Sequence, residues 1–243
     1  MILTVKGEQN MNEQELSQRL TVVGNAVPKG ARLADIGSDH AYLPVALMLV
    51  GKISYAVCGE VVVGPFQSAQ KQVAKSGLAD KIVVRLADGL AAIKKEDEID
   101  TITIAGMGGT LITSILENGK AQGQLSGHER LILQPNVGEA NVRRWLQKEG
   151  YEILTESILA ENDKIYEVIV AEKTAVKSQL TDKEIFFGPY LLAEKNSVFL
   201  KKWSQEQYAL EKVLIQLQKA KVVPEEKVIA IKQELAWIKE VLE

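Results

Sequence analysis

The chain has 243 residues, 46% of them hydrophobic and 25% charged, which is typical of a soluble protein with one full α/β domain and an appendage. One cysteine, Cys58, excludes a disulfide scaffold, and with only two histidines we expect no metal site. The net charge of −3 argues against tight non-specific nucleic-acid binding. No apolar run approaches the roughly 20 residues of a membrane span, so a cytoplasmic protein without membrane contact is expected.

Apolar runs alternate with helical patterns in the first two thirds of the chain. A helix is expected after Asn12, up to about residue 25. Strands are predicted over 32–36, 53–57, 82–86, 99–105 and 131–133, with helices over 64–76, 110–118 and 139–149. Residues 151–159 and 165–171 are predicted to form a terminal hairpin. This order indicates an α/β fold with a mostly parallel sheet and an antiparallel last strand, the layout of class I (Rossmann-like) methyltransferases.

The pattern changes near residue 180, and we place a domain boundary after residue 172, giving domains 1–172 and 173–243. Residues 183–221 predict one helix, kinked or restarted at Gly188-Pro189, and Pro224 opens a second. Their apolar stripes predict an antiparallel helical hairpin, or coiled coil. The hairpin could pack on itself, associate weakly with a second subunit, or grip a substrate.

The turn after the first predicted strand is the most informative part of the sequence. Asp35, Gly37 and Ser38 stand where an α/β protein binds nucleotide-like ligands. The three glycines of a dinucleotide site are missing, and the acids would repel a pyrophosphate. A cationic ligand therefore fits better, and S-adenosylmethionine is the expected cofactor.

Later turns extend this cofactor site. Glu60, followed by Val61, ends the second strand, where a carboxylate can bind ribose hydroxyls; a solvated surface acid is the alternative. Asp88 and Gly89 could reach the adenine amino group or be an ordinary turn. Gly106, Gly108 and Gly109 surround Met107, where a glycine-rich backbone can pass close to a ligand or simply make a tight turn.

Several of these motifs occur together, in the same order, in one known family. The chain resembles the bacterial TrmK family of tRNA (adenine(22)-N1)-methyltransferases at residues 35–44, 59–61 with 64–65, 88–90, 105–109, 133–136 and 164–167. The resemblance implies a Rossmann-like domain with a C-terminal coiled coil, S-adenosyl-L-methionine as cofactor and tRNA as partner. It also implies that Asp35, Gly37, Glu60, Asp88 and residues 106–109 line the cofactor pocket.

The chemistry that the resemblance implies requires placement more than proton transfer. Adenine N1 carries an in-plane lone pair and no proton, so no general base has to act before methyl transfer. The protein must align N1, the methyl carbon and sulfur, and stabilise positive charge arriving on the base. Our candidates for positioning the base are Asp39, His40, Met107 and Asn136.

Contacts to RNA are less visible because no basic stripe appears. We expect phosphate contacts from five side chains, namely Arg19, Arg143, Arg144, Lys201 and Lys202. Tyr166 or Trp145 could stack on a base, although residues 143–145 are equally compatible with a helix surface carrying a buried tryptophan. Alternatives to a tRNA enzyme are a small-molecule or protein methyltransferase, and a non-catalytic binding protein that docks through the hairpin. The missing dinucleotide motif disfavours a nicotinamide-dependent oxidoreductase.

Overall fold

A computed structural model describes residues 16–175, 179–219 and 224–243. It divides the chain into two compact units, Met1–Gln179 and Leu180–Glu243, so the division falls somewhat later than the predicted boundary after residue 172. None of the helices in these described ranges is long and apolar enough to cross a membrane.

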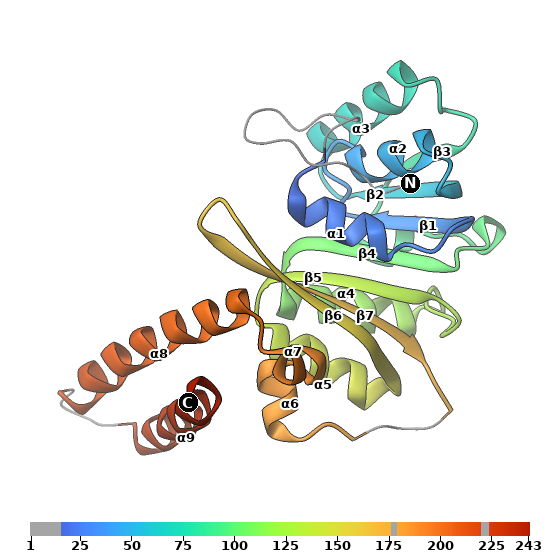
Figure 1. Cartoon of the computed structure of the whole chain (residues 1–243). Coiled ribbons are helices and arrows are strands. Elements are labelled where there is room, and N and C mark those ends of the chain that lie inside the picture. The colour runs from blue at the N-terminus through green and yellow to red at the C-terminus, as the bar shows by residue number, and fades with distance from the viewer. Residues whose placement is uncertain (1–15, 176–178, 220–223) are drawn as a thin grey trace. The chain divides into compact units, whose positions relative to one another are not determined.

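A single sheet in the order β3-β2-β1-β4-β5-β7-β6 forms the centre of the first unit (Figure 1). Only the pairs β5–β7 and β6–β7 are antiparallel; the other four are parallel. The predicted topology is therefore confirmed for these strands. Their bounds are β1 Ala31–Ile36, β2 Ile53–Glu60, β3 Ile82–Leu86, β4 Thr101–Gly108, β5 Arg130–Val137, β6 Tyr151–Glu161 and β7 Lys164–Lys173.

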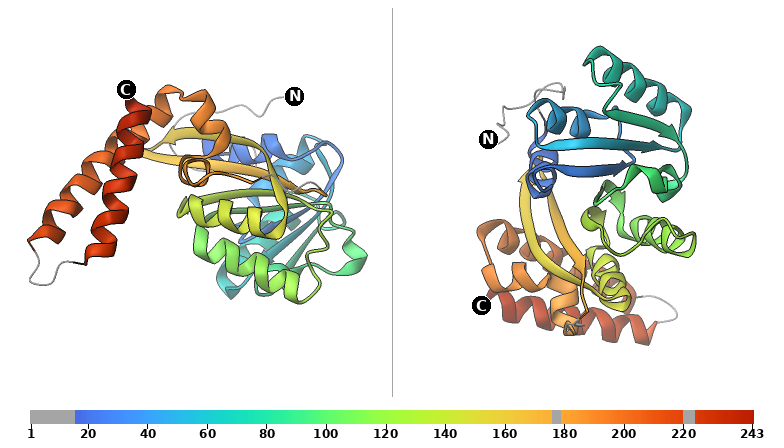
Figure 2. Two further views of the ribbon diagram at one scale, coloured as in Figure 1. Left: turned by 90° about the horizontal axis from the view of Figure 1, so that it is seen from below. Right: turned by 90° about the vertical axis from the view of Figure 1, so that its right-hand side faces the viewer.

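Helices cover both faces of the sheet (Figure 2, left). The helices α1 (Gln18–Ala26), α2 (Tyr42–Leu49) and α3 (Val63–Lys75) contact one another in sequence order, and α4 (Gly109–Ala121) contacts α5 (Glu139–Glu149). Two short 3₁₀ turns, Gly89–Ala92 and Lys95–Asp97, follow β3. Ser17 caps α1 through its side chain, which accepts a hydrogen bond from the Leu20 amide at 3.2 Å; the predicted cap Asn12 lies outside the described residues.

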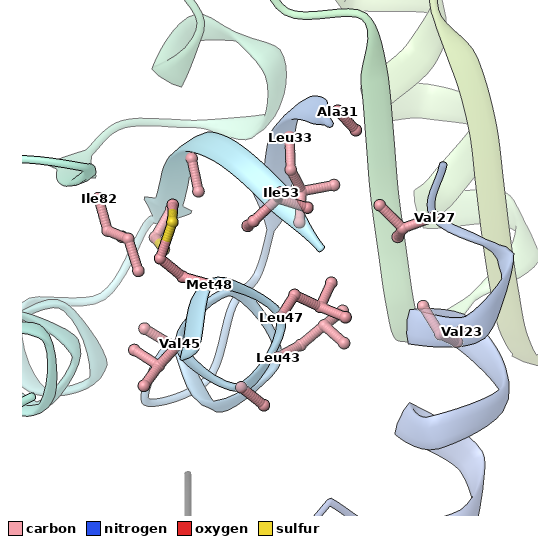
Figure 3. Packing of buried hydrophobic residues seen from close by; sticks show 14 of the residues in the cluster. Val23, Val27, Ala31, Leu33, Leu43, Val45, Leu47, Met48, Ile53 and Ile82 are labelled. Atoms are coloured by element: carbon pink, nitrogen blue, oxygen red, sulfur yellow. The ribbon is translucent and has the colours of Figure 1, made fainter. Parts of the chain in front are cut away.

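The hydrophobic core beneath α1 and α2 holds the first turn of the site in place. Val23 of α1, Leu43 and Leu47 of α2, and Leu33 and Ile53 of the sheet point toward one another (Figure 3). All five are at most 4% exposed, and burying each such side chain is worth about 1.5–3 kcal/mol. Because α2 starts directly after the turn at 37–41, this packing fixes the turn from one side.

The second unit is helical, as predicted, but its first segment is interrupted twice. It contains α6 (Asp182–Phe187), α7 (Pro189–Glu194), α8 (Ser197–Gln218) and α9 (Glu225–Leu242). The break at Gly188 was expected, whereas the second, at left-handed Lys195 with Asn196 capping α8, was not. The long helices α8 and α9 run side by side (Figure 2, left), and the stripe Val228, Ile231, Leu235, Ile238 and Val241 of α9 is buried.

Candidate active site

The parallel strands bring the predicted site turns to one edge of the sheet. Asp35 of β1 lies opposite Cys58 of β2 on one side and Thr103 of β4 on the other. The backbone also joins neighbouring turns, since the Gly37 N–H donates to the Gly59 carbonyl at 2.9 Å. Cys58 is fully buried, as expected for a core residue at a strand end. The acids at the ends of β1 and β2 therefore share one edge.

The turn after β1 has an unusual backbone. Gly37 has φ +71°, and the three non-glycine residues Asp39, His40 and Ala41 also have positive φ, at 38°, 67° and 59°. Such conformations cost of order 1–3 kcal/mol each for non-glycine residues and gather at functional sites. The sequence indicated the need for Gly37 but carried no signal for the three residues that follow. The Asp39 N–H donates to Glu60 Oε1 at 2.6 Å, which ties the turn to β2.

Asp35 is buried beneath this turn and serves as its anchor. Its carboxylate accepts hydrogen bonds from Ser38 Oγ at 2.7 Å and from Thr103 Oγ1 at 2.6 Å. Burial raises the pKa of Asp35, although these two bonds and the nearby Arg19 act in the opposite direction. Our sequence analysis missed Thr103; the alternation of threonine and isoleucine at 101–104 was the signal that could have found it. A buried acid bound by neutral hydroxyls leaves negative charge for a cationic ligand.

Glu60 is the second buried acid of the edge, only 6% exposed. Burial raises its pKa, and the hydrogen bond from the Asp39 amide lowers it. The next residue, Val61, is 66% exposed. The Ala87 N–H donates to the Glu60 carbonyl at 2.8 Å, so the exposed Asp88 and left-handed Gly89 follow directly beside it. The edge thus extends from Asp35 to Asp88 as predicted.

The glycine-rich segment 106–109 forms the end of β4 and the first residue of α4, whereas the sequence predicted that the strand ends at residue 105. Its glycines are needed for different reasons. A Cβ on Gly37 would lie 2.2 Å from the Met107 Cε, so the Met107 side chain rests on the first turn. A Cβ on Gly109 would lie 2.2 Å from the Gly138 carbonyl oxygen, so packing between two turns explains this glycine without a ligand. Gly106 is exposed and has φ +81°, a left-handed conformation that favours glycine. Gly108 precedes α4 in extended backbone.

The remaining predicted base-positioning residues flank this loop. Asn136 is exposed, and its Nδ2 donates to the Gly106 carbonyl at 2.8 Å. His40 stacks on Tyr42 with ring centroids 5.4 Å apart, and its Nε2 lies 3.5 Å from Asp39 Oδ1. The side chains of His40 and Asp39 are 44% and 74% exposed. All three side chains are therefore accessible to a substrate.

One predicted RNA contact is wrong. Arg143 is completely buried, and its guanidinium donates to Glu156 at 2.7 Å and to Glu167 at 2.5 Å. The apolar face of α5 carries it inward, where it joins the helix to β6 and β7. It cannot meet a phosphate without unfolding.

The other predicted RNA contacts have different surroundings. Arg144 is exposed on α5, and its Nη1 lies 3.4 Å from Asn141 Oδ1. Trp145 is buried, donating to Glu117 at 2.8 Å, and so does not stack on a base. Lys201 is exposed on α8, while the Lys202 ammonium lies 5.3 Å from the Trp203 ring centre. Arg19 lies at the site itself, donating to Gln134 Oε1 at 2.6 Å with its guanidinium 5.5 Å from the Tyr166 ring centre.

Among the described residues, no group of three or more histidine, cysteine or acidic side chains is arranged to hold a metal ion. The residues present fit an adenosine-type cofactor with a cationic sulfonium better than a pyrophosphate ligand. Asp35 and Glu60 supply carboxylates, and the missing side chain at Gly37 makes room for Met107 against the same turn.

Known proteins match the chain over nearly its whole length. A curated Bacillus subtilis tRNA (adenine(22)-N(1))-methyltransferase is 51% identical over 214 residues, covering 86% of this chain and 89% of the relative. The crystal structure of the B. subtilis m1A22 tRNA methyltransferase TrmK has a TM-score of 0.87 at 47% identity, over 94% of this chain and 99% of that one. The structure of M. capricolum TrmK with S-adenosyl-homocysteine has a TM-score of 0.81 at 30% identity, over 94% and 99%.

The family model agrees with these relatives. It matches residues 33–240, which include the edge built around Asp35 and Glu60, helix α8, and α9 up to residue 240. The chain belongs to the TrmK family, described as tRNA (adenine(22)-N(1))-methyltransferase.

Proposed function

We propose that this protein transfers a methyl group from S-adenosyl-L-methionine to N1 of adenine 22 in tRNA. The observation that carries the proposal is the acidic edge of the sheet, where buried Asp35 and Glu60 lie beside the Gly37 turn in a chain of this family. The 51% identical relative is named for the same reaction, and M. capricolum TrmK was solved with the demethylated cofactor product.

In this proposal the cofactor lies along the edge from Met107 to Asp88. Asp35, Gly37 and Ser38 form the wall at the methionine end, and Gly106 and Gly108 form the opposite wall. Glu60, one of whose oxygens is held by the Asp39 amide, binds the ribose hydroxyls, with Val61 covering the sugar. Asp88 and Gly89 border the adenine.

The bound cofactor supplies an activated methyl group: the N1 lone pair forms the new C–N bond while the C–S bond breaks and its electrons pass to sulfur. The residues of this chain place the base for that displacement. Asn136 presents an exposed amide that can pair with the adenine edge, and the accessible carboxylate of Asp39, within the turn itself, can offset positive charge arriving on the base. His40 with Tyr42 offers a stacking surface, and Met107 fills the space between base and turn.

We place the tRNA contacts on exposed Arg144 of α5, exposed Lys201 of α8 and half-buried Lys202 of α8. N1 lies on the Watson–Crick edge, so a paired adenine has to be freed first, at a cost of a few kcal/mol.

A cytoplasmic location follows from the tRNA substrate. The exposed apolar residues Tyr208, Ile215 and Ile229 are compatible with weak self-association of the hairpin, which sedimentation over a range of concentrations would detect.

The direct test is methyl transfer from labelled cofactor to unmodified tRNA, with the modified base mapped by primer extension. We expect one labelled site, at adenine 22, and none in a transcript carrying guanine there. Labelling of small molecules or protein without tRNA would instead favour the other methyltransferase functions. Cofactor binding without transfer to any tRNA would favour a binding protein.

A further inference from the structure

The pairing of β4 with β5 is interrupted at Gly106. Ala105 lies opposite Gln134 and Met107 lies opposite Pro135, so Gly106 is an extra residue with no partner in the ladder. Bulges of this kind redirect the side chains beside them and are frequent next to active sites. Here the bulge precedes Met107, whose side chain rests on Gly37. The conformation of Gly106 therefore determines where the loop meets the cofactor turn.

Two side-chain amides replace the missing ladder partner. The Gly106 N–H donates to Gln134 Oε1 at 2.9 Å, and Asn136 Nδ2 donates to the Gly106 carbonyl at 2.8 Å. Gln134 Nε2 in turn donates to Asn136 Oδ1 at 3.1 Å and to the Pro135 carbonyl at 2.9 Å. Gln134 is fully buried, whereas Asn136 is exposed at the edge. The buried Gln134 amide thus helps to orient the accessible Asn136 amide.

Arg19, the Gly106 N–H and the Pro135 carbonyl together fix the direction of the bonds in this network. Its Nη1 donates to Gln134 Oε1 at 2.6 Å, and a guanidinium can only donate. If the Gln134 amide were flipped, its NH₂ would face both the guanidinium and the Gly106 N–H. With the oxygen held by Arg19, Gln134 must donate to Asn136 Oδ1, which turns Asn136 Nδ2 toward Gly106. Arg19 therefore contributes, together with the Gly106 backbone, to the orientation in which the Asn136 amide faces a base.

The position of Arg19 is itself determined by the β6–β7 hairpin. The backbone N–H groups of Gln18 and Arg19 donate to the Glu161 carboxylate at 2.6 and 3.4 Å. The guanidinium lies 5.5 Å from the centre of the Tyr166 ring on β7. A Cβ on Gly106 would lie 3.4 Å from Arg19 Nη1, so Arg19 is in close contact with the bulge. These contacts describe a residue built into the site rather than one displayed on a surface.

We propose that Arg19 is a positioning residue for methyl transfer: acting through Gln134, it fixes the Gly106 bulge and the orientation of the Asn136 amide. It replaces our sequence-based interpretation of Arg19 as a phosphate contact. It rests on the proposed function, because the purpose of the aligned amide is to place the target adenine.

The test is a double-mutant cycle with Arg19→Met and Gln134→Met. We expect Arg19→Met to lower kcat by tenfold or more, up to about 100-fold, as for a misplaced reacting group. The affinity for tRNA should stay within about twofold of the wild type, with the same dependence on salt. Since Arg19 acts through Gln134, the double variant should be no slower than Gln134→Met alone.

Arg144→Met is the matched control, because Arg144 is an exposed arginine outside this network. If Arg19 were a phosphate contact, its loss would resemble that of Arg144, with the salt slope of tRNA binding reduced by about one. That result, or losses that add in the double variant, would overturn the proposal. Arg19→Lys keeps a donor and should recover part of kcat; equal loss in both Arg19 variants, at an unchanged urea midpoint, would also contradict it. Failure of the wild type to methylate tRNA would instead refute the proposed function.

Discussion

Two pairs of buried acids in the first unit differ in their hydrogen-bond partners: one pair is bound by an arginine and the other by neutral groups. Glu156 and Glu167 are paired directly with buried Arg143. Burial alone would lower the pKa of Arg143, but the two carboxylates raise it. Asp35 and Glu60 are equally buried but are bound by hydroxyls and a backbone amide, and burial raises the pKa of both.

This difference in partners distinguishes acids that stabilise the fold from acids that bind a ligand. A buried charge that has its counter-ion in the chain holds elements together, here α5 with β6 and β7. A buried carboxylate with only neutral donors is electrostatically incomplete, and a cationic ligand completes it. The four predictions below test this distinction.

The largest effect is expected from Arg143→Met. Removing the cation takes the ion-pair partner away from buried Glu156 and Glu167, which costs about 3–5 kcal/mol of unfolding free energy. Urea unfolding measures it, with the neighbouring exposed Arg144→Met as a control expected to change stability by no more than about 0.5 kcal/mol. A loss of unfolding free energy below about 1 kcal/mol for Arg143→Met would show that this ion-paired group does not stabilise the fold.

Glu60→Gln should act on the cofactor instead of the fold. Loss of a charged hydrogen bond, worth about 1.5–3 kcal/mol, weakens cofactor affinity by about 10- to 100-fold. Titration calorimetry gives the affinity, and urea unfolding of the cofactor-free protein should change little. If stability fell while cofactor affinity stayed the same, Glu60 would belong with the structural acids.

Asp35→Asn tests the same distinction through pH. The pKa of Asp35 is higher in the folded protein than its ordinary value of 3.8, so the folded state holds this proton more readily. Its contribution to stability therefore declines as pH rises through the folded pKa. Asp35→Asn, which keeps an acceptor for Thr103, should be more stable than the wild type at neutral pH.

Unfolding free energies from acid to neutral pH check this expectation. The advantage of Asp35→Asn should grow with pH and disappear toward 3.8, while cofactor affinity at neutral pH falls. A gap between variant and wild type that narrows as pH rises would show that the Asp35 charge is stabilising.

The smallest effects are expected from the surface cations. Arg144→Ala and Lys201→Ala should each weaken tRNA binding a few-fold and reduce its salt slope by about one, because each removes one phosphate contact. Cofactor affinity and unfolding should not change. Filter binding at several salt concentrations measures the tRNA affinity and its salt slope. An unaltered slope would show that the residue concerned does not contact tRNA.

The sequence alone predicted most of the framework. Short apolar runs ending in acids or glycine identified every strand from β1 to β7 and the turns holding Asp35, Glu60 and Gly106, because strand period and turn chemistry are local properties. The apolar stripe of α9 was equally clear. The second break, at Lys195, was missed because a lysine carries no local signal for positive φ.

Only the tertiary structure decided what individual polar residues do. Arg143 and Arg144 are adjacent in sequence, yet one is buried between two glutamates and the other is exposed. Thr103 and Gln134 became part of the site only when β4 and β5 placed them beside Asp35 and Gly106. Arg19 contacts Gln134 across 115 positions of sequence. Burial and long-range hydrogen bonding depend on which segments meet, and periodicity within one segment does not contain that information.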